Sequence, residues 1–83
     1  MNKQRKKRIA EAVELISQAK DLLEIIGEEE EAAFDNLPEG LQESARGEQM
    51  EANADAMAEA YDYLDEAIDA LEDAELVDLG VKR

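Results

Sequence analysis

The sequence predicts an all-α protein, in which an antiparallel, coiled-coil-like hairpin of two helices pairs with a second copy to form a four-helix bundle. Apolar residues recur at spacings of three and four in two long segments that a short linker separates, which is typical of packed helices. With 83 residues and no Cys, one hairpin has too little core to be stable without a partner subunit. Bases gather at the start of the chain and acids in the rest, so an antiparallel hairpin brings opposite charges together.

The first helix is predicted over about residues 5–34. Its apolar seam repeats every seven residues and has two positions in each repeat. Large residues occupy the first of these positions, and alanines occupy most of the second. The pattern is weakest at Gly27 and the four glutamates after it, because Gly costs about 1 kcal/mol relative to Ala in a helix and like charges four residues apart repel. The residues of this helix expected in the core are Ile9, Ile16, Leu23 and Ile26.

The second helix is predicted over about residues 48–76. Alanines flank its seam on both sides, which indicates neighbours on two sides, as in a bundle of more than two helices. Its methionines and tyrosines suit either the core or a soft peptide-binding surface. The core is favoured because all but Tyr63 fall on the seam, and Tyr63 is expected at a subunit boundary. The residues expected in the core are Met50, Met57, Tyr61, Leu64, Ile68 and Leu71.

The linker, 35–47, contains the turn signals. Pro38 is expected at the first position of a short helical turn, and Ser44 is expected to cap the second helix. The tail, 77–83, follows the second helix. We therefore expect a single domain over 1–83.

The charge distribution predicts the kind of partner. Residues 1–20 contain six Lys or Arg and two acids, whereas residues 21–81 contain twenty-one acids and one base. The net charge of −14 repels nucleic acid and anionic membranes and attracts basic protein surfaces. The expected partners are thus a basic protein surface and a second copy, with no direct contact to nucleic acid or membrane.

The basic start, Lys3–Arg8, invites a nucleic-acid interpretation, but it lacks interleaved aromatic residues. Pairing within the hairpin is the better interpretation. Each surface ion pair contributes only about 0–1 kcal/mol, but several together favour the antiparallel topology. The acids expected opposite this start are Glu72, Asp73, Glu75 and Asp78.

A stripe of carboxylates on the second helix is the candidate binding site. Its members recur every three or four residues, so neighbours lie about 5–6 Å apart on one face, close to the spacing of phosphates along a nucleic-acid strand. This pattern predicts a surface that mimics DNA and docks on a basic partner. The alternative is a solvated face that only keeps the protein soluble. The stripe comprises Glu48, Glu51, Asp55, Glu59, Asp62, Glu66, Asp69 and Asp73.

No enzymatic activity, metal or cofactor is expected. The chain has no His and no Cys, which removes the commonest general base, the usual zinc ligands and thiol nucleophiles. Carboxylates three residues apart also occur in magnesium sites, but with 23 acids in 83 residues such spacings arise by chance. The lack of Cys, of a signal peptide and of a run of about 20 apolar residues favours the cytoplasm.

The linker also carries a resemblance. Residues 34–50 read FDNLPEGLQESARGEQM, and together with the basic Met1–Arg8 they resemble a group of small acidic helical proteins encoded by phages and prophages. The resemblance implies a phage-derived accessory protein in the host cytoplasm, of a kind that often counters host defences. The expected function is non-enzymatic inhibition of a host defence protein at its nucleic-acid-binding surface. The alternative is a structural or adaptor dimer with a merely solubilising acidic face.

Overall fold

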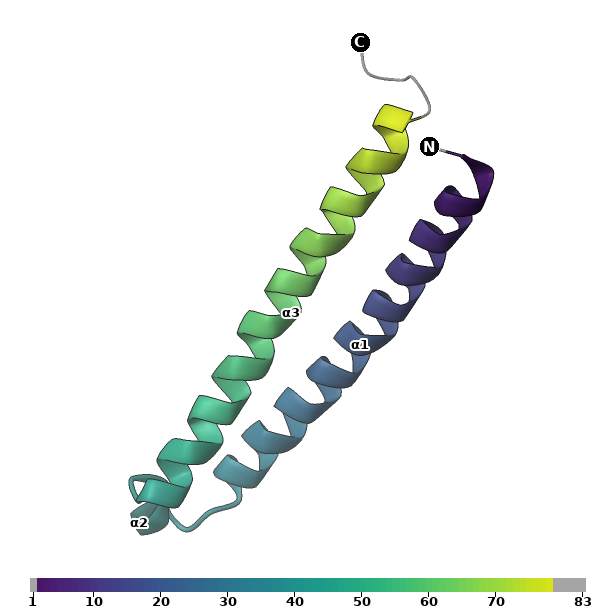
Figure 1. Ribbon diagram of the computed structural model, residues 1–83. Coiled ribbons are helices and arrows are strands. Elements are labelled where there is room, and N and C mark those ends of the chain that lie inside the picture. The colour runs from purple at the N-terminus through teal and green to yellow at the C-terminus, as the bar shows by residue number, and fades with distance from the viewer. Residues whose placement is uncertain (1, 79–83) are drawn as a thin grey trace.

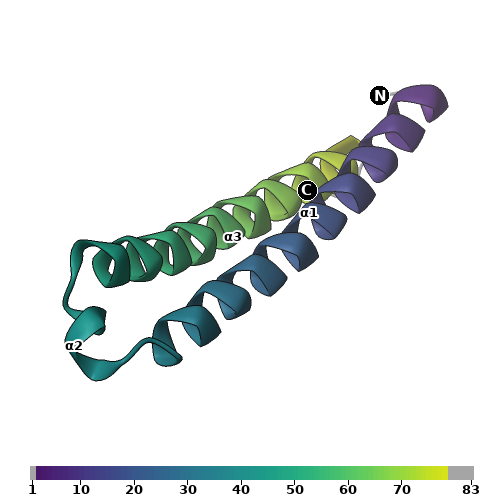
Figure 2. The ribbon, with the colours of Figure 1, turned by 90° about the horizontal axis from the view of Figure 1, so that it is seen from below.

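The computed structural model is an antiparallel hairpin of two long helices (Figure 1). It describes residues 2–78, with side chains through residue 74. The helices are α1 (Lys3–Asp35), α2 (Glu39–Gln42) and α3 (Ala45–Asp78). α1 and α3 lie side by side, and α2 closes the bend between them (Figures 1 and 2). The predicted all-α fold and helical hairpin are confirmed for the described residues.

α1 begins before the predicted residue 5 because Asn2 caps it. The Asn2 side chain accepts a hydrogen bond from the backbone N–H of Arg5 at 2.8 Å, and such caps contribute about 1 kcal/mol. The helix then runs without a break through Gly27, where the sequence pattern was weakest.

Gln42 stabilises the bend between α1 and α3 through two hydrogen bonds. Its side-chain amide donates to the backbone carbonyl oxygens of Phe34 at 3.2 Å and of Leu37 at 3.4 Å. Pro38 precedes α2 as its N-cap residue, one position before the predicted one. The segment expected to be mostly linker therefore contains a four-residue helix anchored to the end of α1.

Ser44 precedes α3 and caps it, as the sequence predicts: the backbone N–H of Gly47 donates to its hydroxyl oxygen at 3.3 Å. Gly47 is the one residue among those described that is fully buried. A Cβ atom at this position would lie 2.7 Å from the carbonyl carbon of Gln42. The turn from α2 into α3 therefore requires a glycine here.

α1 and α3 meet along a seam of half-buried side chains. No apolar residue among those described is fully buried. The six residues of α3 expected in the core are half-buried, as are Ile9, Ile16 and Leu23 of α1. Ile26 differs, because its side chain is 41% exposed. Gly27 lies against α3 instead, and a Cβ atom added to Gly27 would be 3.5 Å from the Cβ atom of Met57. A straight α-helix drifts by about 20° per heptad, so the contact line moves from residue 26 to residue 27.

Two polar contacts between the helices set their register. Lys20 Nζ lies 2.6 Å from Asp65 Oδ1, and the Asn53 side-chain amide donates to Glu30 Oε1 at 2.7 Å. The basic start of α1 lies at the same end of the hairpin as the end of α3 (Figure 1). The predicted pairing with Glu75 and Asp78 involves side chains outside the described set.

A candidate protein-binding surface on the acidic flank

The predicted stripe forms a continuous acidic surface along α3. All eight of its carboxylates are exposed. From the first to the last, the stripe covers 25 helical steps, or about 38 Å at about 1.5 Å per residue. We call this surface the acidic flank; it consists of Glu48, Glu51, Asp55, Glu59, Asp62, Glu66, Asp69 and Asp73.

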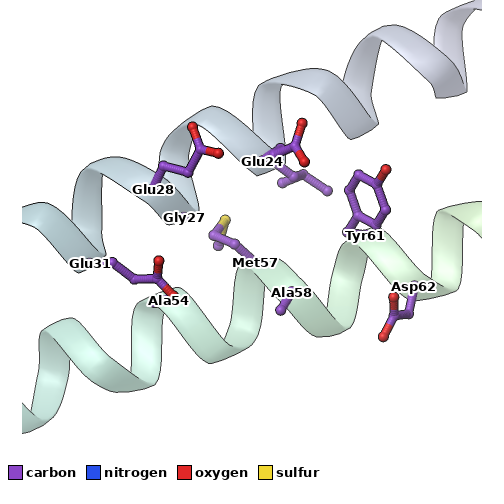
Figure 3. Close-up of a pocket in the computed structure, with 10 residues that line it drawn as sticks. Glu24, Gly27, Glu28, Glu31, Ala54, Met57, Ala58, Tyr61 and Asp62 are labelled. Atoms are coloured by element: carbon purple, nitrogen blue, oxygen red, sulfur yellow. The ribbon is translucent and has the colours of Figure 1, made fainter.

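Beside the acidic flank, a groove runs between α1 and α3 (Figure 3). It consists of two adjoining hollows of about 270 Å³ and about 380 Å³, which share Glu31 and Ala54. The apolar residues that line it are Leu23, Gly27, Phe34, Met50, Ala54, Met57, Ala58 and Tyr61. The acids that line it are Glu24, Glu28, Glu31, Asp35, Glu51, Asp55 and Asp62.

Four of these acids come from α1 and lie outside the stripe that the sequence predicts as the binding site. Glu24, Glu28, Glu31 and Asp35 recur at steps of four, three and four, the same spacing as the acidic flank. The repeat was visible in the sequence, but only the hairpin geometry places it across a groove from Asp55 and its neighbours. The candidate site is therefore built from both helices.

Lys20 marks the end of this groove nearest the chain termini. Its ammonium lies 4.7 Å from the ring centroid of Tyr61 and donates to Asp65, and this hydrogen bond raises the pKa of Lys20. Because Lys20 forms an ion pair with Asp65, the charge of this acid is offset within the hairpin. Asp65 is therefore not counted in the acidic flank. In the sequence this lysine was only counted among the six bases of residues 1–20, whereas in the structure it makes a contact between the two helices.

An apolar floor between acidic edges suits the side chains of a basic partner. Lys and Arg place their aliphatic stems on apolar surface while their charged ends remain with water or carboxylates. Arg also binds a carboxylate through two parallel hydrogen bonds. Within the described residues, no group of three acidic side chains is placed to hold a metal ion. The helices described contain no segment with the length and apolar character needed to cross a bilayer.

Comparisons with protein-family models, with curated proteins and with solved structures find no match to this chain.

Proposed function

We propose that this protein is a non-enzymatic inhibitor that binds a basic, nucleic-acid-binding surface of a host protein in the host cytoplasm. The observation that carries the proposal is the groove, whose apolar floor lies between carboxylates of α1 and the acidic flank of α3. The flank supplies a line of negative charges at about the spacing of strand phosphates. The partner's nucleic acid is then excluded by occupancy, without a chemical step.

The composition of the flank favours binding over a purely solubilising role. Soluble surfaces usually mix both signs of charge, whereas α3 has no Lys or Arg after Arg46. A solubilising face also has no need of an apolar groove beside it. Met50 and Met57 line this groove with flexible thioethers, which adapt to a partner's shape.

The resemblance of residues 34–50 to phage and prophage proteins supports a target among host defences. The second candidate function is an adaptor dimer whose acidic flank only keeps it soluble. The two differ in one property, because only the inhibitor displaces nucleic acid from its partner.

We also propose that two hairpins associate into a four-helix bundle. In support, the seam between α1 and α3 contains no fully buried apolar residue among those described, so one hairpin shields its apolar side chains only partly. Sedimentation at micromolar concentration tests this proposal: a folded, monodisperse monomer would contradict it.

The acidic flank is tested by removing charge without changing shape. The test variant carries Asp55→Asn, Asp62→Asn, Glu66→Gln and Asp69→Asn. The control removes four exposed charges away from the groove, through Glu11→Gln, Glu14→Gln, Asp21→Asn and Glu43→Gln. Both variants have the same net charge, so a difference between them reports the position of the charges.

Wild type and both variants are used to capture proteins from a bacterial lysate at low and high salt, and the affinity for the captured protein is then measured. We expect the test variant to bind about tenfold more weakly at low salt, mainly through slower association, and the control to bind nearly as wild type. An equal loss in both variants would mean that the flank is not a docking surface.

A further inference from the structure

The exposed large apolar residues of the two long helices gather on one side of each. On α1, Leu15 is 65% and Leu22 60% exposed, and Ile25 and Ile26 are also exposed. On α3, Tyr63 is 60% exposed, midway between two exposed alanines seven residues before and after it. We call this surface the apolar flank; it consists of Leu15, Leu22, Ile25, Ile26, Ala56, Tyr63 and Ala70.

The apolar flank lies opposite the groove. Leu22 is two residues from Glu24, and Tyr63 is two residues from Tyr61; Glu24 and Tyr61 both line the groove. Two residues correspond to a rotation of about 200° around an α-helix, so both exposed side chains point away from the groove side. The register set by Lys20 and Asp65 also brings Leu22 level with Tyr63 across the hairpin.

We infer that a second copy of this chain covers the apolar flank in antiparallel orientation. This inference rests on the proposed homodimer and specifies its contact surface. Leu15 and Ile26 lie on either side of the middle of α1, so a two-fold axis there lets two hairpins overlap over their full length. The whole face of the hairpin, about 50 Å long and 21 Å wide, has an area of about 1,000 Å² per copy, more than the about 800 Å² typical of a stable interface. The apolar flank occupies the central part of this face, about 20 Å long.

Charge determines the orientation. In an antiparallel pair, the basic Lys3–Arg8 of one copy comes beside the bend of the other, where Glu28–Glu31 and Asp35 lie. A parallel pair would bring the two basic starts together and the two acidic bends together. Charges within about 8 Å interact even at physiological salt, so the antiparallel pair is favoured.

This packing has a consequence for binding. When the apolar flanks meet, the two grooves face outward on opposite sides of the bundle with most of each acidic flank, and Glu59 and Glu66, which neighbour Tyr63 on α3, lie at the edge of the contact. Each dimer then offers two identical surfaces to basic partners. The small side chains of Ala56 and Ala70 let the second hairpin approach closely around Tyr63.

The orientation is tested with a spin label at the bend. The chain has no Cys, and a side chain at Gly40 meets nothing within 4 Å, so Gly40→Cys provides a unique labelling site. An antiparallel dimer separates the two labels by about 50 Å or more, the length of α1, whereas a parallel dimer brings them within about 25 Å. A short distance would overturn the inference while leaving the proposed homodimer intact.

The contact surface is tested by sedimentation. Wild type is expected at twice the chain mass of 9.2 kDa. Leu22→Glu with Tyr63→Glu should weaken dimerisation at least a hundredfold. Ala10→Glu with Ala58→Glu adds the same charge at exposed positions that lie five residues, or about 140° of helix rotation, before Leu15 and Tyr63, and should leave the dimer unchanged. A Leu22→Glu/Tyr63→Glu protein that remains dimeric would overturn the inference, and a monomeric wild type would overturn both it and the homodimer.

Discussion

At the scale of single residues, Gly27 and Gly47 lie inside long helices but in different surroundings. A side chain at Gly27 would make an ordinary contact with Met57, with a Cβ–Cβ distance of 3.5 Å. A side chain at Gly47 would overlap the backbone of Gln42. Gly27 therefore only lowers the stability of α1, whereas Gly47 is required by the turn from α2 into α3.

We therefore expect opposite effects from the same substitution. Gly27→Ala should raise the free energy of unfolding by about 1 kcal/mol, the difference in helix propensity. Gly47→Ala should lower it by about 1–3 kcal/mol, because the backbone must move to make room. Urea denaturation measures both, and a Gly47→Ala protein as stable as wild type would contradict the close approach of α2 and α3.

Lys20 should make stability depend on alkaline pH. Its hydrogen bond to Asp65 raises its pKa in the folded protein above the ordinary value of 10.5. The resulting stabilisation is complete below pH 10.5 and is lost as the pH rises through the folded-state pKa. In the Lys20→Arg variant the guanidinium stays charged over this range. The melting temperature of wild type should therefore fall more than that of the variant between pH 9 and about pH 12. Parallel losses would mean that the pair does not contribute.

At the scale of elements, the sequence predicted α3 better than α1. The three-four pattern of α3 places its six large seam residues on the side that the structure half-buries. On α1 the same pattern put Ile26 in the seam between the two helices, whereas the structure leaves it 41% exposed and places Gly27 there, because a strict heptad does not follow the drift of a straight helix. A place for Ile26 in the core of a dimer stays a prediction. The early start of α1 was not predicted, since it depends on the cap from Asn2.

The seam of α3 is tested at Leu64. Leu64→Asp places a charge among half-buried apolar side chains and should cost about 2–4 kcal/mol in unfolding free energy. Ala58→Asp adds the same charge at an exposed position of the same helix and should cost less than about 1 kcal/mol. Circular dichroism during thermal unfolding measures both, and equal effects would show that Leu64 does not lie in the seam.

At the scale of the whole molecule, charge segregation and the two periodic segments were enough to predict the antiparallel hairpin. The groove could not be predicted, because it depends on where small residues of the two helices meet. Gly27, Ala54 and Ala58 leave space between α1 and α3 that larger side chains would fill. Which acids line that space follows from the register, which Lys20 and Asp65 set.

The net charge should make the fold more stable in salt. With a charge of −14, repulsion among carboxylates opposes the compact state, and salt screens it. We expect the melting temperature to rise by about 5 °C between about 20 mM and about 500 mM potassium chloride, which corresponds to about 1 kcal/mol. The melting temperature of the variant that lacks four charges of the acidic flank should rise less over the same range of salt. A melting temperature that falls with salt would mean that ion pairs outweigh the repulsion.

The central claim is that the acidic flank and its groove compete with nucleic acid for a basic protein surface. It is tested most directly by the fluorescence anisotropy of labelled duplex DNA bound to the protein captured at low salt. We predict that wild type lowers the anisotropy to that of free DNA. The variant at Asp55, Asp62, Glu66 and Asp69 should need about tenfold more protein. DNA that stays bound while this protein also binds would contradict the account and favour the adaptor.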